Sequence, residues 1–325
     1  MSATSTPLDV ARFIILDSET TGSNPNKAVE LAALDWTFGR PMESEHFLET
    51  YIDPQQKIDP ASQAVHHIMD EDVVGAPLLE DVAPDWSTWV GDSPILAYNA
   101  PFDRQVLAST PLYDKRWCDV WRAAMHVWYI GQENEDGFKL TSFKQQELRY
   151  WLKVPKTSGD AHRAAADIQV TAMILDRIIQ VYLACGNPAT QEAFLDWVEA
   201  PIQHLTLPIG TAQFLGKTPE QLEDWALKKA FDPDYFLFES FVKFNVHECL
   251  LPEYQRRFGG DPRGFGRNKA PVANSTSPSS DRGGGFRIRS SSQTPAPPSQ
   301  SEVAGGSAGS GSSRFARRVN MPPHE

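Results

Sequence analysis

Acidic residues at three separate places in this 325-residue chain could meet at one site. Asp17 and Glu19 follow a short apolar run. In an extended segment, residues two apart point to the same side, so both carboxylates could face one cation. Asp103 follows a second apolar run, and Asp167 comes five positions after His162. Cation binding is therefore the chemistry that the first pair could perform, with Asp103 within reach of the same sheet edge.

Each of these groups alone also fits an ordinary structural role. An Asp-x-Glu pair is expected by chance among 42 acidic residues, and it fits a solvated turn. Asp103 could simply favour the positive end of a helix dipole. His162 with an acid five positions later fits an exposed histidine near a helix start. The groups become informative only through their order and spacing along the chain.

The elements that would position these residues alternate between strand-like and helix-like patterns from residue 12 to 200. Short apolar runs predict four strands, at residues 12–16, 29–38, 45–52 and 94–97. The first should end at Asp17, and the second and third suit antiparallel neighbours. Residues 159–181 predict one long helix, because apolar residues recur there every three or four positions. The pattern predicts an α/β domain with a mixed sheet flanked by helices.

The rest of the chain divides into a small second unit and a tail. Residues 201–258 predict a mainly helical unit, with helices at 219–230, at 233–244 and near 249–258. Fifty-odd residues are marginal for independent stability, so we expect this unit to dock on the first domain or on a partner. Residues 259–325 are rich in Gly, Ser, Pro and Arg, which predicts a disordered tail. Residues 1–11 are expected to be flexible.

The charge of the chain is unevenly distributed. The formal net charge is −12. Residues 259–325 carry nine Lys/Arg against four Asp/Glu, a formal +5, which leaves −17 for residues 1–258. This acidity predicts weak non-specific DNA binding by the globular part, but it does not exclude a nucleic-acid partner met through bound divalent cations. Residues 263–267 and 285–289 interleave Arg, Phe and Gly, which suits single-stranded nucleic acid or a solubilising linker.

The composition also bears on location. The longest apolar runs are far shorter than the roughly 20 residues of a membrane span, so no membrane partner is expected. Residues 1–12 lack the basic and apolar regions of a secretory signal. The three cysteines are widely separated and form no CxxC pair, which argues against a disulfide framework or a zinc site. Together these features predict a cytoplasmic protein.

The three groups, taken in order, resemble the signature of the DEDDh 3′→5′ exonucleases. The matching residues are Asp17-x-Glu19, Asn99-Ala-x-Phe-Asp103 and His162-x₄-Asp167. Residues 15–22, 29–35, 51–73 and 98–107 are similar to the bacterial exodeoxyribonuclease X family and, more distantly, to the epsilon proofreading subunits of DNA polymerase III. The resemblance covers residues 12–185, with a fainter likeness over 207–258. It implies a ribonuclease H-like sheet and removal of nucleotides from DNA 3′ ends, in repair or recombination.

The resemblance also implies roles for individual residues. Two Mg²⁺ ions, for which Mn²⁺ could substitute, would be held by the carboxylates of Asp17, Glu19, Asp103 and Asp167. Such ions would stabilise the entering and leaving oxygens of phosphodiester hydrolysis, and His162 would be the general base. Four residues are expected to bind substrate: Thr20, His66, Phe102 and Asn99. His66 also fits an exposed helix end, and Phe102 also fits a core position.

Two departures from the family pattern concern substrate contacts. Ser23 stands where the family often has an apolar residue that wedges between bases, which puts base wedging in doubt. Tyr98 stands where a histidine is frequent.

Three other functions remain open. An exoribonuclease would share the same five positions and differ in contacts to the 2′-hydroxyl. A proofreading subunit would need a segment that binds a polymerase, and the C-terminal region is the place for such a polymerase or repair-protein partner. A nucleic-acid-binding or scaffold module without activity would be favoured if a carboxylate were missing, but all four are present. The expected partner is DNA with single-stranded 3′ ends, and RNA is the alternative.

Overall fold

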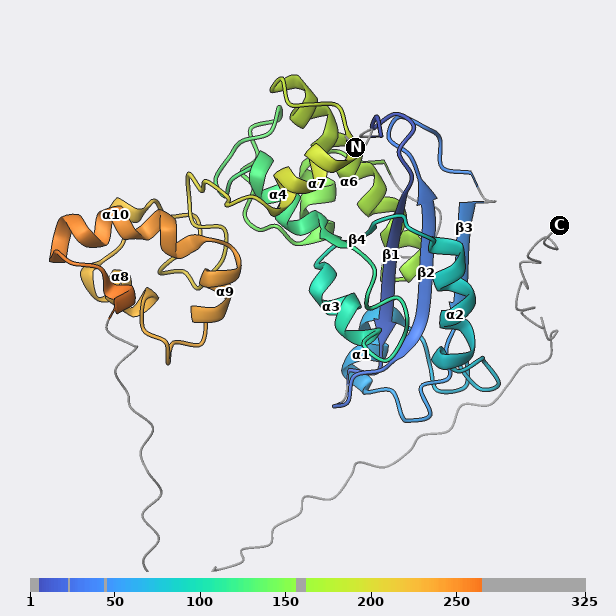
Figure 1. The fold of residues 1–325 in the computed structure, drawn as a ribbon. Coiled ribbons are helices and arrows are strands. Elements are labelled where there is room, and N and C mark those ends of the chain that lie inside the picture. Colours follow the sequence, from blue (N-terminus) through green and yellow to red (C-terminus); the bar gives the residue numbers. More distant parts are fainter. Residues whose placement is uncertain (1–5, 23, 44–45, 156–161, 265–325) are drawn as a thin grey trace, which may run out of the picture. The chain divides into compact units, whose positions relative to one another are not determined.

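The computed structural model describes residues 6–22, 24–43, 46–155 and 162–264. Its centre is a five-stranded sheet in the order β3-β2-β1-β4-β5 (Figure 1). The strands are β1 (Phe13–Thr20), β2 (Ala28–Trp36), β3 (Phe47–Tyr51), β4 (Ile95–Ala97) and β5 (Trp117–Asp119). β1 pairs antiparallel with β2 and parallel with β4, and β2 pairs antiparallel with β3. The predicted mixed sheet is confirmed.

Helices fill the connections and both faces of this sheet. Those before residue 200 are α1 (Pro60–His66), α2 (Leu79–Val90), α3 (Ala100–Val106), α4 (Val120–Val127), α5 (Gln145–Trp151), α6 (Ala164–Ala184) and α7 (Gln191–Glu199). Pro101 lies in the first turn of α3, as predicted, where its missing amide hydrogen leaves no helix bond unmade. Among the described helices, none is both long and apolar enough to span a membrane.

Alternation along β1 decides which face each of its side chains meets. Phe13 and Ile15 belong to the larger buried cluster, which α6, α4 and α7 cover. Ile14 and Leu16 belong to a second cluster on the opposite face, under α2. Figure 1 shows α2 and α6 on different sides of β1 and β2. Because side chains alternate along a strand, the odd-numbered residues that follow Ile15 point to the side of α6.

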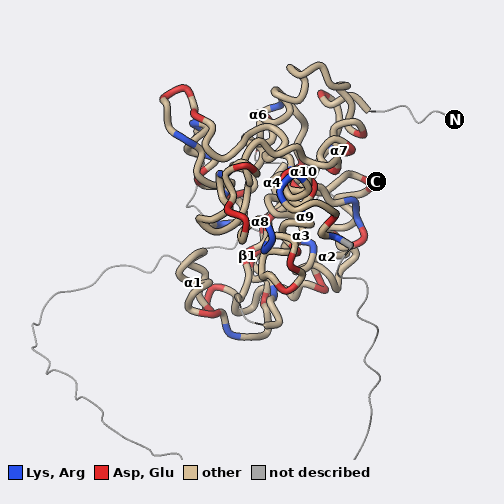
Figure 2. Tube along the Cα trace, turned by 90° about the vertical axis from the view of Figure 1, so that its left-hand side faces the viewer, with Lys and Arg blue, Asp and Glu red and all other residues tan. Residues whose placement is uncertain are grey.

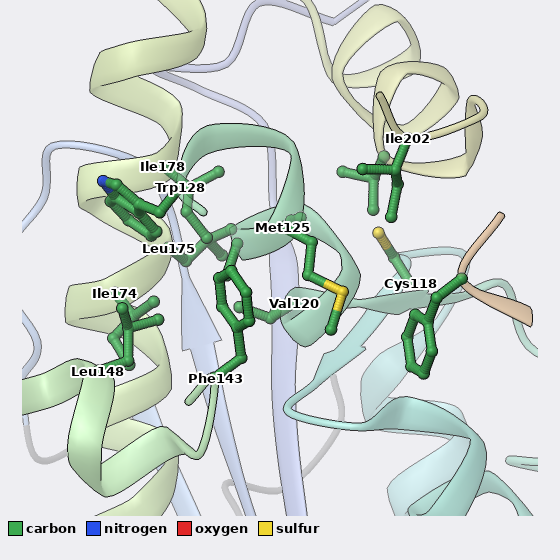
Figure 3. Close-up of a cluster of buried hydrophobic side chains, with 14 of the residues drawn as sticks. Cys118, Val120, Met125, Trp128, Phe143, Leu148, Ile174, Leu175, Ile178 and Ile202 are labelled. Carbon is green, nitrogen blue, oxygen red and sulfur yellow. The ribbon is translucent and has the colours of Figure 1, made fainter. Parts of the chain in front are cut away.

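The larger cluster also packs α5 against α6. Ile174 and Leu175 of α6 lie with Leu148 of α5 in this cluster (Figure 3). All three side chains are fully buried. Burial of a leucine or isoleucine contributes about 1.5–3 kcal/mol, so these contacts hold α5 firmly against α6.

Two predicted boundaries near the acidic residues are wrong. β1 does not end at Asp17: the ladder to β2 continues, with Asp17 opposite Ala32 and Glu19 opposite Glu30. The long helix does not include His162, because α6 begins at Ala164 and extends to Ala184. Residues 159–161 lie outside the described part of the chain. Both acids of the first pair are therefore held on a paired strand.

The later segment is helical, as predicted, but two of its helices, at 224–230 and 238–243, are shorter than predicted, and the third begins earlier, at Val246. It contains η2 (Pro219–Gln221), α8 (Asp224–Ala230), α9 (Phe238–Lys243) and α10 (Val246–Phe258). The predicted helix at 219–230 is broken, because Leu222 and Glu223 have extended backbones. Residues 1–266 form one compact unit. The predicted division at residue 200 stays a prediction, and the predicted disorder of the tail falls almost entirely outside the described residues.

The first described residues also pack within this unit. Leu8 is 2% exposed, and its amide donates to the carbonyl of Ala189. This contact lies within the stretch that was expected to be flexible, residues 1–11.

Candidate active site

Three carboxylates meet on the α6 side of the sheet. Asp17 and Glu19 are odd-numbered residues of β1, and Asp167 lies in the first turn of α6. Each offers an oxygen, and these oxygens all lie within 4.8 Å of one another. Asp167 is buried, and the other two are partly buried. The sequence-based prediction that the Asp-x-Glu pair and the helical aspartate meet is confirmed by this geometry.

Asp103 contacts the same strand, β1, from the start of α3. It lies in the first turn of α3, directly after β4, and is 1% exposed. Its Oδ1 accepts hydrogen bonds from the amide and the hydroxyl of Ser18, at 3.0 and 2.7 Å. Ser18 stands between Asp17 and Glu19, so Asp103 is fixed beside this pair. Its oxygens are not part of the group of three, but its charge adds to their repulsion.

Burial and repulsion both disfavour ionisation of these acids. Loss of water is the largest cause, and it raises the pKa of Asp17, Asp103 and Asp167 as well as that of Glu19. Repulsion between the carboxylates raises the pKa of Asp17 and Glu19 further. The pKa of Glu19 rises to about 8 and that of Asp103 to about 7, although the Ser18 bonds lower the latter. Such a cluster stores repulsion that a bound cation would relieve.

An ion pair with a buried carboxylate fixes the start of α6. The carboxylate of Glu30, on β2, is 1% exposed and pairs with the Arg163 guanidinium, which also donates to the Tyr51 hydroxyl at 2.9 Å. The same carboxylate accepts the amide of Ala164, the first residue of the helix, at 2.9 Å. Arg163 itself has an extended backbone. One strand carboxylate thus determines where α6 begins and, one turn later, where Asp167 lies.

His162 lies just before this anchor. Its side chain is exposed, and its backbone is in the left-handed region, with φ of 61°. Burial raises the pKa of Asp167, and His162 opposes that rise, which places the imidazole in the neighbourhood of the carboxylate. The predicted general base is therefore beside the cluster and open to solvent.

Thr20 and His66 are linked to each other. His66 ends α1 and is 2% exposed. Its Nδ1 accepts from the amide of Ile68 at 3.0 Å, so its Nε2 is the donor to the Thr20 carbonyl at 3.1 Å. Burial lowers the pKa of His66, which favours this neutral ring. The exposed position considered for His66 is excluded, and in this arrangement the ring positions Thr20 instead of offering a nitrogen to a phosphate.

Asn99 and Phe102 flank the start of α3. Asn99 has a left-handed backbone conformation. Its backbone amide donates to the Asp119 carboxylate at 3.1 Å, and its side-chain oxygen accepts from Nζ of Lys243 at 3.4 Å. Phe102 is 42% exposed, so the core position considered for it is excluded. It lines a cavity of about 520 Å³ on the α3 side, next to Val106 and Leu79. Both residues therefore border the place where Asp103 emerges.

The donor set suits hard divalent cations. Its ligands would be carboxylate oxygens alone, and such oxygens bind Mg²⁺ and Mn²⁺ in preference to softer metals. The three close oxygens come from elements that are fixed by backbone pairing and by the Glu30 anchor. The residues present therefore fit the cation site that the resemblance implies.

Comparisons with known proteins agree with this geometry. The RNase T family model, described as exonuclease, matches residues 14–175. Exodeoxyribonuclease 10 of Escherichia coli K12 is 30% identical over 240 residues, which are 74% of this chain and 93% of that protein. The chain belongs to this exonuclease family.

Other relatives match the exonuclease over shorter lengths. A DNA polymerase III subunit epsilon-like protein of Rhodobacter capsulatus is 36% identical over 105 residues, 31% of this chain and 15% of that protein. The PolC-type DNA polymerase III of Staphylococcus saprophyticus is 35% identical over 98 residues, 7% of its length. A solved structure, exonuclease X in complex with 5′ overhanging duplex DNA, is 27% identical, with a TM-score of 0.45 over 57% of this chain and 99% of that one.

Sequence reasoning missed the residues that hold the acids of the exonuclease in place. Ser18 lies inside the Asp-x-Glu motif and passes for a spacer, yet it fixes Asp103. Glu30 stands in a mainly apolar strand, and an acid flanked by Val29 and Leu31 in such a run was the available signal. Gln146, which donates to Oδ1 of Asp167 at 2.8 Å, gave no signal, because its segment was not predicted as a helix.

Removing the Glu30 carboxylate should destabilise the exonuclease strongly. Glu30→Gln leaves Arg163 with only the more distant and more exposed Glu49, at 4.0 Å, as an acidic partner, and it disturbs the first amide of α6, so we expect unfolding to become easier by about 2 kcal/mol. Urea unfolding of the purified chain measures this. The matched control is Asp35→Asn on the same strand, whose carboxylate is 31% exposed where that of Glu30 is 1% exposed, so that weakening its pair with Arg12 should cost under about 1 kcal/mol. Equal losses in the two variants would contradict the anchor role.

Stability without cations should fall as pH rises. Glu19 ordinarily has a pKa of 4.5, and the folded chain raises it to about 8, so the folded state retains a proton that the unfolded state releases between these values. The Glu19 contribution is neutral below pH 4.5 and destabilising above pH 8. Glu19→Gln should therefore exceed wild type in unfolding free energy by at least about 1 kcal/mol more at pH 8.5 than at pH 4.5. Urea titrations in EDTA test this, and a difference independent of pH would refute it.

Proposed function

We propose that this exonuclease hydrolyses DNA from its 3′ ends and releases nucleoside 5′-monophosphates. Two divalent cations, Mg²⁺ or in its place Mn²⁺, would be held by Asp17, Glu19, Asp103 and Asp167. His162 would take the proton from the attacking water. The observation that supports this proposal most directly is the close set of three carboxylate oxygens, with Asp103 tied to the residue between two of them.

The chemistry of phosphodiester hydrolysis explains why such a cluster is useful. Bound divalent cations would lower the pKa of water and stabilise charge on both the entering and the leaving oxygens. The four carboxylates contribute by holding their oxygens in place before substrate arrives. A histidine can accept a proton near neutral pH, and the exposed side chain of His162 is open to a water at the cluster.

The overall charge favours a local mode of substrate binding. Lys and Arg are scattered among Asp and Glu along the Cα trace (Figure 2), and residues 1–258 carry a formal −17. A nucleic acid would therefore be attracted chiefly by the cations at the cluster. DNA is the proposed polymer because the relative that matches over 93% of its length is named an exodeoxyribonuclease. A role in repair or recombination and a polymerase or repair-protein partner remain proposals from the same relatives.

Degradation of end-labelled oligonucleotides tests the proposed reaction. With Mg²⁺, single-stranded DNA should lose mononucleotides from its 3′ end, and EDTA should stop this. Asp17→Asn removes one carboxylate with little change in shape and should lower the rate by about 10³-fold or more. His162→Ala should lower it by about 10²-fold or more, because general-base catalysis contributes that much.

Controls separate the proposal from its rivals. Asp85→Asn, an exposed acid on α2 at the opposite face of the sheet, should leave the rate unchanged. Faster degradation of matched RNA than of DNA would replace the proposal with an exoribonuclease. Wild-type rates in Asp17→Asn would overturn the assignment of the site, and absence of cleavage of either polymer would favour a binding module.

A further inference from the structure

The carboxylate of Asp167, the fourth proposed cation ligand, accepts a hydrogen bond from a side chain that has no part in the family signature. Gln146 lies in the first turn of α5, and its Nε2 donates to Oδ1 of Asp167 at 2.8 Å. The neighbouring Gln145 donates to the carbonyl of Asp167 at 3.0 Å and to the hydroxyl of Thr171 at 2.7 Å. Two adjacent side-chain amides of α5 thus donate to the backbone carbonyl and to the carboxylate of Asp167.

The buried guanidinium of Arg149 determines the orientation of the Gln146 side-chain amide. Nη1 of Arg149, one turn later on α5, donates to Oε1 of Gln146 at 3.3 Å. Turning the amide over would set its oxygen against the carboxylate and its NH₂ against the guanidinium, and both contacts would be repulsive. The Arg149 side chain is only 5% exposed, and within the described residues its Nε has no hydrogen-bond partner. Such a guanidinium is costly to bury, which calls for an explanation beyond packing.

We propose that Gln146, oriented by Arg149, is a positioning residue that holds the Asp167 carboxylate in the geometry needed for cation binding. The proposal rests on the proposed function, because it assumes that Asp167 is a cation ligand. The amide fixes one oxygen while leaving the carboxylate charged. The positive charge of Arg149 lowers the pKa of Asp167 through space. A guanidinium bound directly to Asp167 would also occupy the carboxylate oxygen and compete with the cation, whereas the intervening amide transmits orientation without that contact.

The surrounding contacts make this chain of bonds rigid. Leu148, between Gln146 and Arg149, is fully buried in the cluster that contains Ile174 of α6 (Figure 3). The Gln146 amide also lies 3.4 Å from Oε1 of Gln145, so both of its hydrogens have acceptors. Partners of metal ligands typically change metal affinity or activity 10- to 100-fold when they are removed.

Binding of Mn²⁺ to the full purified chain, measured by calorimetry, tests the proposal. Gln146→Met keeps the length of the side chain and removes the donor, so it should weaken Mn²⁺ binding by about 10-fold or more. Gln146→Asn should do the same, because its amide is withdrawn by one methylene, and it serves if the first variant folds poorly. In both variants kcat should fall and recover at high Mg²⁺ concentration, while KM for DNA changes little.

The role of Arg149 is tested by a double-mutant cycle. If Arg149 acts through Gln146, Arg149→Met should weaken Mn²⁺ binding, and the double variant should bind no more than about twofold more weakly than Gln146→Met alone. Additive losses would show that Arg149 acts on the site independently of Gln146, and a lower melting temperature with unchanged Mn²⁺ affinity would show that it serves only packing. Either result would overturn this part. Gln180→Met, which removes an exposed amide-to-Asp176 bond elsewhere on α6, is the matched control and should bind as wild type does.

Asp17→Asn distinguishes failure of this proposal from failure of the proposed function. If wild type binds Mn²⁺ and Asp17→Asn does not, the site is real, and wild-type affinity in both Gln146 variants would then overturn the positioning role alone. If wild type binds no Mn²⁺, or binds it as well as Asp17→Asn does, the cation site itself is wrong, and both proposals fall.

Discussion

Four carboxylates can share one edge of a sheet only if their repulsion and their loss of water are offset by other contacts. In this chain the two aspartates that are most buried each have a dedicated donor: Ser18 for Asp103 and Gln146 for Asp167. Donation of this kind favours the charged form, yet the pKa of every member of the cluster remains raised. Hydrogen bonds therefore hold the carboxylates in place, but the protein does not neutralise their negative charge. This is the condition expected of a preformed site for divalent cations.

The framework of the site follows from where its backbone is fixed. Pairing of β1 with β2 sets Asp17 and Glu19 on the α6 side, and the same pairing places Glu30 opposite Glu19. Glu30 would then add a further negative charge to the cluster, but Arg163 pairs with it. Because the Glu30 carboxylate also accepts the first amide of α6, a single residue sets the start of the helix, while Arg163 offsets part of the Glu30 charge, which still raises the pKa of Asp17 and Glu19. The pairing of β1 with β2, the charge beside the cluster and the start of α6 thus all involve Glu30.

Much of this arrangement was predictable from sequence, but its supports were not. The order of the acidic motifs predicted which residues would meet, through its resemblance to the exonuclease signature and because residues two apart on a strand face the same side. Apolar periodicity placed the interior of α6 well and its start badly, because the start is set by the long-range contact between Arg163 and Glu30. β1 was predicted too short, since Asp17 and Glu19 interrupt the apolar run while the backbone ladder continues. Gln146 depends on tertiary contact alone and leaves no local pattern.

The contrast between His162 and Asp167 follows from their positions around the helix start. Asp167 is inside α6, where its backbone is bonded to the helix and its carboxylate to α5, so it can hold one orientation. His162 stands before the Arg163 anchor, in a left-handed turn that ends the helical geometry and leaves its ring exposed. A cation ligand gains from being fixed before binding, whereas a group that takes a proton and returns it must exchange with solvent between turnovers. Under the proposed function, the Glu30 anchor would separate these two requirements within five residues, because it gives the helix a defined first residue and leaves His162 and Arg163 outside helical geometry.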